Sequence, residues 1–99
     1  MSKSATIIEP IAPGEILAAE FLEPMEMSAR ALAEHIDVPA NRITEIIKGR
    51  RGVTGDTALR LSKALGTTPE FWINLQAHFD LERAKDEIGD LQIKPLVAA

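Results

Sequence analysis

Residues 28–48, SARALAEHIDVPANRITEIIK, are the stretch that decides the fold. Their apolar side chains recur three and four positions apart, which is the spacing of a buried helix face. They fall in two sets, the first at Ala29, Leu32, Ala33 and Ile36 and the second at Ile43, Ile46 and Ile47. Residues 37–40 leave room only for a tight turn between the two. Two short amphipathic helices joined in this way predict a helix-turn-helix.

Three further helices are expected around this motif. Pro13 and Glu15 favour a helix start, and Pro24 is expected to end that helix. Ser28 and Thr54 are candidate N-caps for the helices that follow them, while Gly49 and Gly66 are typical of helix ends. The run Thr68-Pro69-Glu70 starts a last helix, which is expected to reach Gly89. The sequence therefore predicts an all-α, five-helix domain over residues 13–89, with the helix-turn-helix at about 28–48.

The two ends of the chain differ from this domain. Residues 1–12 show no helical period and are expected to form an N-terminal arm. Residues 90–99 form a C-terminal tail in which Leu91, Ile93 and Val97 alternate with other residues. Because Pro95 limits backbone pairing, this alternation is only a weak signal for an edge strand.

Length and composition limit the classes of protein. The 99 residues, 45% of them hydrophobic, suit one small domain, and dimerisation would help so small a domain to bury apolar surface. There is no cysteine, so disulfides and thiolate metal sites are excluded. No apolar run approaches the roughly 20 residues that span a membrane, and the N-terminus lacks the apolar core of a secretory signal. We expect a cytoplasmic protein without a membrane partner.

Charge is distributed unevenly along the chain. The net charge is −4, which at first argues against binding nucleic acid. Residues 1–27 carry one cation and five acids, residues 28–63 seven cations and four acids, and residues 64–99 three cations and six acids. The local potential decides whether phosphates are attracted, so the basic middle segment favours a nucleic-acid partner. The acidic ends are candidate surfaces for a basic protein.

The second helix of the motif is expected to enter the major groove of DNA, because that is how helix-turn-helix proteins bind. If its isoleucines face the core, four polar side chains lie on the opposite face, and their chemistry suits base reading. They are Asn41, Thr44, Glu45 and Lys48. The competing interpretation is a solvated helix face with an ordinary Glu–Lys pair.

A second set of residues is placed to contact phosphates, which orient a protein without reading sequence. Arg30 begins the first helix of the motif, and Arg50 and Arg51 follow the second. A role in surface solubility would explain these arginines equally well. Helix capping alone would explain the hydroxyl groups of Ser28 and Thr54. The full set is Ser28, Arg30, Arg42, Arg50, Arg51 and Thr54.

Three of the four aromatic residues gather in the last helix. The cluster is Phe71, Trp72, Leu75 and Phe79. It is interpreted as core, as a dimer interface, or as both. No cations interleave with it, so Trp72 is not expected to stack on bases.

Catalysis finds no support in the sequence. His35 and His78 lie far apart, and neither belongs to a His-Glu-x-x-His run. There is no glycine-rich phosphate loop and no cysteine nucleophile. We expect neither an enzyme, nor a metal, nor a cofactor.

Several motifs also resemble a known family. Residues 13–17, 32–33, 42–46, 49–54, 56–61 and 69–76 occur together in this order in the HigA antitoxins. This VapI-like family belongs to the Cro/C1-type (XRE) helix-turn-helix class, and the resemblance covers roughly residues 11–84. It implies a lambda-repressor-like homodimer that binds a palindromic operator in double-stranded DNA. It also implies a partner, a basic HigB-type mRNA endonuclease, which the antitoxin silences.

By position, the family's DNA contacts would fall on the residues already singled out between Arg30 and Arg51. Two positions depart from the pattern. Asp37 stands where glycine is frequent in the turn, and Asp adopts the left-handed region more readily than most residues. Pro39 replaces a frequent serine cap, so the first base-facing residue has no side-chain donor.

Two other hypotheses remain open on the sequence. The first is a free-standing repressor with the same fold and no toxin. The second is a helical protein–protein adaptor that does not bind DNA. Salt dependence of DNA binding separates the adaptor from both repressors, and the neighbouring gene separates an antitoxin from a free repressor.

Overall fold

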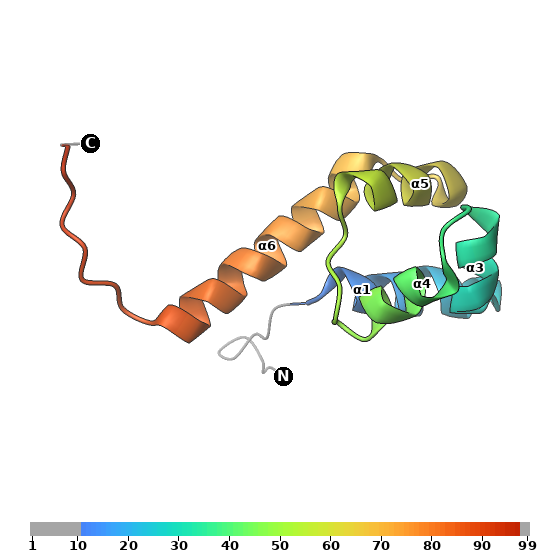
Figure 1. Cartoon of the computed structure of the whole chain (residues 1–99), viewed down its shortest axis with the longest axis horizontal. Helices are drawn as coiled ribbons and strands as arrows, with labels where there is room; N and C mark the ends of the chain where they lie inside the picture. Colours follow the sequence, from blue (N-terminus) through green and yellow to red (C-terminus); the bar gives the residue numbers. More distant parts are fainter. Residues whose placement is uncertain (1–10, 98–99) are drawn as a thin grey trace, which may run out of the picture.

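The computed structural model describes residues 11–97, which contain helices and no strand. A continuous first helix consists of α1 (Pro13–Ile16), the π-helical segment η2 (Leu17–Leu22) and α2 (Glu23–Met25). The others are α3 (Ala29–His35), α4 (Ala40–Ile47), α5 (Gly55–Leu65) and α6 (Pro69–Ile88) (Figure 1). The five predicted helices are therefore confirmed. The N-terminal arm expected at residues 1–12 lies outside the described residues except for its last two.

The first helix does not end at Pro24 as expected, but continues to Met25. Immediately before the proline, the Glu23 N–H donates to the carbonyl of Ala18, five residues back, which is a π-helical bond. Proline has no N–H, and its ring clashes with the carbonyl four residues earlier. A wider turn gives the ring the space that an α-turn would deny it. The helix then ends at Glu26, whose φ of 51° is left-handed.

Side-chain caps begin three of the helices at the predicted residues. The Ser28 hydroxyl accepts from the Ala31 N–H at 3.0 Å, and the Thr68 hydroxyl accepts from the Phe71 N–H at 3.1 Å. Thr54 caps α5 by accepting from the Thr57 N–H. Each bond satisfies a backbone donor that has no partner inside its helix.

The turn of the motif is also as predicted. Asp37 has a φ of 63°, so it occupies the left-handed position. Pro39 precedes α4 without a side-chain hydrogen bond. At the start of α4 the Arg42 N–H instead donates to the Pro39 carbonyl at 2.9 Å.

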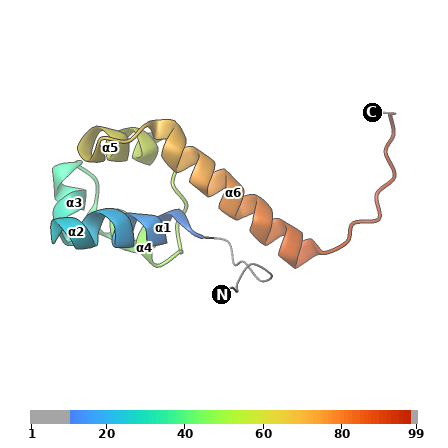
Figure 2. The same ribbon diagram turned by 180° about the vertical axis from the view of Figure 1, so that it is seen from behind.

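The helices form a small body from which one helix projects. In Figure 1, α5 lies on one side of this body and α3 and α4 on the other, with the first helix packed beside α4. The helix α6 starts next to α5, and its C-terminal half points away from the body, as the reverse view in Figure 2 also shows. The core between the elements comprises Leu17, Leu22, Leu32, Ala33, Ile36, Ile43, Ile46, Val53, Ala58, Leu61 and Trp72.

The aromatic cluster of α6 divides between core and surface. Trp72 is fully buried, its ring centroid lies 5.5 Å from that of Phe21, and its Nε1 donates to the Thr67 hydroxyl at 2.7 Å. Leu75 is half-buried and packs against the same core. Phe79 is half-buried with the Arg83 guanidinium 5.4 Å from its ring centroid, and Phe71 is 37% exposed. Trp72 and Leu75 thus belong to the core or pack against it, whereas Phe79 and Phe71 lie outside the core.

Residues 91–97, whose sequence carries only a weak edge-strand signal, form coil without strand pairing in the described part of the chain. A strand needs a second strand to pair with, and the described residues of this chain contain none. No helix in the described part of the chain combines the length and apolar character that crossing a membrane requires.

Candidate nucleic-acid interface

The helix α4 buries its isoleucine face and turns its polar face outward. Ile43 and Ile46 are fully or almost fully buried, and Ile47 is half-buried against the core. On the other side Asn41 and Lys48 are exposed, whereas Thr44 and Glu45 are half-buried. The Thr44 hydroxyl donates to the Asn41 carbonyl at 3.2 Å, so in the free chain its hydrogen is engaged within the helix. The face predicted for base reading is therefore accessible, most fully at its two ends.

The position of α4 depends on a close approach by the first helix. A Cβ atom at Gly14 would lie 2.8 Å from the Ile47 Cα and nearer still to the Ile46 carbonyl. Only glycine fits at this distance, because both contacts are to backbone that cannot rotate away. The first helix thus packs directly against the backbone at the C-terminal end of α4.

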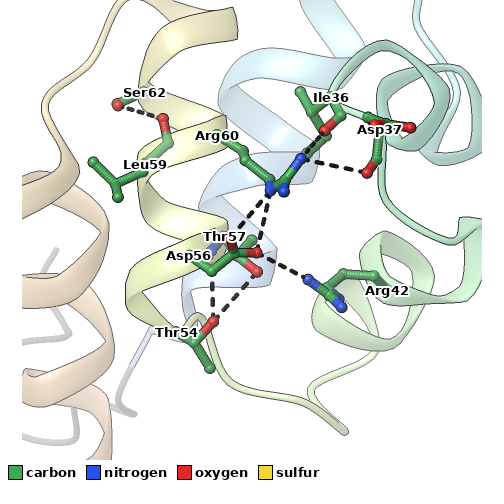
Figure 3. Close-up of polar contacts among 9 residues, drawn as sticks. All are labelled: Ile36, Asp37, Arg42, Thr54, Asp56, Thr57, Leu59, Arg60 and Ser62. Carbon is green, nitrogen blue, oxygen red and sulfur yellow. Dashed lines mark hydrogen bonds and ion pairs between the residues drawn. The ribbon is translucent and has the colours of Figure 1, made fainter.

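A second support joins α4 to α5 and to the turn of the motif (Figure 3). The Arg60 Nε donates to the Asp56 carboxylate at 3.1 Å, and the same carboxylate accepts from Arg42 at 3.3 Å. Arg60 Nη1 also donates to the Ile36 carbonyl at 2.8 Å and to the Asp37 carbonyl at 3.3 Å. These carbonyls lie at the C-terminal end of α3, where helices leave acceptors unpaired. Arg60 therefore holds the end of α3, while Asp56 links it to α4.

The sequence did not identify Asp56 and Arg60 as residues that hold the interface in place. An acid and an arginine four residues apart on one helix were visible as a pair. Nothing in the sequence showed that the arginine would also bind carbonyls 23 and 24 residues earlier in the chain. That contact exists only because α5 packs across the turn.

The residues predicted to contact phosphates lie in three places. Ser28 is the exposed N-cap of α3 and Arg30 is exposed in the first turn of that helix, while Arg50 and Arg51 are exposed in the loop after α4. Arg42 is held by Asp56 near the start of α5, two residues from the exposed cap Thr54. The structure thus gives Arg42 an intramolecular partner that the sequence did not predict.

The loop after α4 has an anchor on α6 that the sequence also did not reveal. The Val53 N–H donates to Gln76 Oε1 at 2.7 Å. In the sequence Gln76 was visible only as a polar residue next to Leu75 in the expected last helix, a signal that does not identify its partner.

The described residues hold no cluster of three or more His, Asp or Glu side chains arranged to bind a metal. His35 ends α3, whereas His78 lies exposed on α6. The exposed side chains on α3, on α4 and in the following loop are cations and hydrogen-bonding groups, which suit contact with a polyanion.

Known proteins share both the sequence and this arrangement. A family model described as helix-turn-helix matches residues 19–72. Virulence-associated protein I of Dichelobacter nodosus is 45% identical over 83 residues, which cover 84% of this chain and 77% of that protein.

Two solved structures superpose on nearly the whole described fold. An addiction module antidote protein of the HigA family from Coxiella burnetii has a TM-score of 0.83 at 48% identity, covering 89% of this chain and 99% of that one. The Pseudomonas aeruginosa antitoxin HigA, solved with the higBA promoter, has a TM-score of 0.84 at 38% identity, with the same coverage of 89% and 99%.

Proposed function

The chain belongs to the HigA-type, VapI-like antitoxins of the Cro/C1 helix-turn-helix family, and from this we propose its partners and mode of action. It is the antitoxin of a type II toxin–antitoxin pair that represses its own operon by binding the operator. The single observation that carries the DNA-binding part is the outward polar face of α4, opposite the buried Ile43 and Ile46. A relative with the same fold was solved with promoter DNA, which supports the same use of this face.

In the proposed complex α4 lies in the major groove. Asn41 offers two hydrogen bonds that suit adenine, and Glu45 can accept from cytosine N4. Thr44 and Lys48 complete the base-reading set. Arg30, Arg50 and Arg51 contact the flanking phosphates together with Ser28 and Thr54. Arg42, which pairs with Asp56 in the free chain, leaves this partner and contacts a phosphate instead.

We propose a homodimer that binds an inverted repeat. Two copies would place their α4 helices in successive major grooves, about 34–36 Å apart. The dimer face is a second apolar stripe of α6, whose members lie three or four residues apart and point away from the core. They are Ile73, Ala77, Leu81, Ala84 and Ile88, and Leu81 and Ile88 are 55% and 57% exposed. A contiguous apolar stripe of this kind is typical of an interaction surface.

The toxin partner is proposed to be a basic, HigB-type mRNA endonuclease that this chain masks without performing chemistry itself. Net charges of −4 over residues 1–27 and −3 over residues 64–99 suit a basic partner. The proposed place of action is the cytoplasm, where operator DNA and mRNA are both present.

Co-expression with the neighbouring gene tests the toxin assignment. The expected result is that the neighbouring product arrests growth alone, is tolerated with this chain, and co-purifies with it. If this chain does not relieve the growth arrest, the toxin assignment is wrong and the chain is a free-standing repressor. Failure to bind any duplex at low salt would instead favour the adaptor, since phosphate binding is strongest there.

Replacing Asn41 by alanine is expected to weaken operator binding by about 1–3 kcal/mol, because a bidentate base contact is lost. Preference should relax at one base pair of each half-site, measured by gel shift against single-base operator variants. An unchanged preference profile would remove Asn41 from the base-reading set.

Replacing Arg50 by alanine is expected to weaken operator and unrelated duplexes by a similar factor. The plot of log affinity against log salt concentration should become shallower by about 1, because one phosphate contact is lost. Lys63 of α5, an exposed cation outside the proposed interface, offers a matched control variant. A loss confined to one DNA sequence would show that Arg50 reads a base.

A further inference from the structure

We propose that Gln76 is a positioning residue through which α6 fixes the phosphate-contacting loop of residues 49–53. This inference rests on the proposed DNA binding and assigns to α6 a part in it beyond dimerisation. Gln76 itself does not contact DNA in the proposed complex. It acts on the arginines by holding the backbone that carries them.

The loop is fixed at two points. At its start, the Gly49 N–H donates to the Ile46 carbonyl at 3.0 Å and the Arg50 N–H donates to the Glu45 carbonyl at 2.9 Å. Gly49 is left-handed, with a φ of 77°, so the chain leaves α4 at once. At its end, the Val53 N–H donates to Gln76 Oε1 at 2.7 Å. Arg51 therefore lies between an anchor on α4 and an anchor on α6.

The second anchor is shaped to fit the glutamine amide. A Cβ atom at Gly52 would lie 3.1 Å from both the Gln76 Cδ and its Nε2, closer than side chains normally approach. The absence of a side chain at Gly52 thus lets the amide lie against the loop backbone. Val53 is 4% exposed, so without Gln76 its buried N–H would lack this acceptor, which is a costly state.

A second hydrogen bond orients the amide. Gln76 Nε2 donates to Asp80 Oδ1 at 2.9 Å, one turn further along α6. With the nitrogen committed to Asp80, the oxygen faces Val53. Both loop arginines line one groove together with Gln76, Asp80 and Arg83, so the anchored segment faces α6 across this groove. The same helix carries the proposed dimer stripe, and Gln76 therefore ties the phosphate loop to the rigid element that sets the spacing of two half-sites.

The test measures DNA binding of the full-length protein as a function of salt. In Gln76→Ala the loop loses its second anchor. The operator and an unrelated duplex should then bind more weakly by the same factor, and the salt plot should become shallower by about 1. Amide hydrogen exchange at Val53 should become faster in the same variant. A purely structural role would lower thermal stability without changing the salt slope measured well below the unfolding transition.

A reciprocal swap provides the charge-matched control. Gln76→Glu keeps an acceptor for Val53 but places a carboxylate against Asp80. In the double variant Gln76→Glu with Asp80→Asn, the asparagine donates to the glutamate, and net charge equals that of the original chain. We expect the single glutamate variant to bind weakly and the double variant to recover the original salt slope and affinity.

The outcomes separate this inference from the proposed function. If the unmodified protein binds no duplex, the proposed function fails. If it binds and Gln76→Ala leaves the salt slope unchanged, even with faster exchange at Val53, the positioning role is wrong. A double variant no better than Gln76→Glu alone would also contradict it, because the hydrogen-bond geometry would then not matter.

Discussion

Replacing Trp72 by alanine is expected to lower the free energy of unfolding by about 3–5 kcal/mol, the usual range for a large buried aromatic. Trp72 has no exposed surface, and it joins the first helix to α6 through Phe21. Its loss also leaves the Thr67 hydroxyl without the indole donor. The whole free energy of unfolding of a small domain is about 5–15 kcal/mol, so this single change removes a large part of the stability. Urea unfolding followed by circular dichroism measures it.

Phe71→Ala is the matched control for this prediction. The residue is adjacent on the same helix, and its ring lies 5.0 Å from that of Trp72, but it is 37% exposed. A much smaller loss is expected, since less apolar area returns to water. Equal losses in the two variants would mean that Trp72 is not the centre of the core.

Replacing Leu81 by glutamate is expected to convert the proposed dimer into monomers. The change buries a charge in the centre of the α6 stripe, where no partner for it is provided. A monomer contacts one half-site at a time, so operator affinity should fall by about 10²–10⁴-fold, the usual gain from linking two binding events. Light scattering coupled to size exclusion gives the mass, and gel shift gives the affinity.

Met25→Glu offers a control with the same change in charge. Met25 is 46% exposed, similar to the 55% of Leu81, but it lies on α2 and outside the α6 stripe. This variant should keep both the dimer mass and most of the operator affinity. A Leu81→Glu protein that remains dimeric would place the interface on another surface.

The two large effects arise from one helix with two apolar sides. Trp72, Leu75 and Phe79 face the body, whereas Ile73, Leu81 and Ile88 lie on the other stripe. The sequence showed the aromatic cluster but not which apolar residues would stay uncovered. An apolar period identifies a buried face only when one face is apolar, and here two overlapping periods run along the same helix.

Local features were predictable because they depend on neighbouring residues alone. Ser28, Thr54 and Thr68 cap helices since a hydroxyl can reach an N–H three residues on, and Asp37 adopts the left-handed turn. The same logic failed at Pro24, where the helix changed its winding instead of ending. Proline removes one donor, but whether a helix stops or widens depends on what packs around it.

The sequence by itself determined the five helices, the turn of the motif and the polar face of α4, because periodicity and capping are properties of short segments. The tertiary structure alone decided what holds that face in place. Arg60 donates to the Ile36 carbonyl, 24 residues earlier in the sequence, and the Val53 N–H donates to Gln76, 23 residues later. Such bonds satisfy backbone groups at the ends of helices and loops, and their partners are chosen by which elements pack together, which no short stretch of sequence specifies.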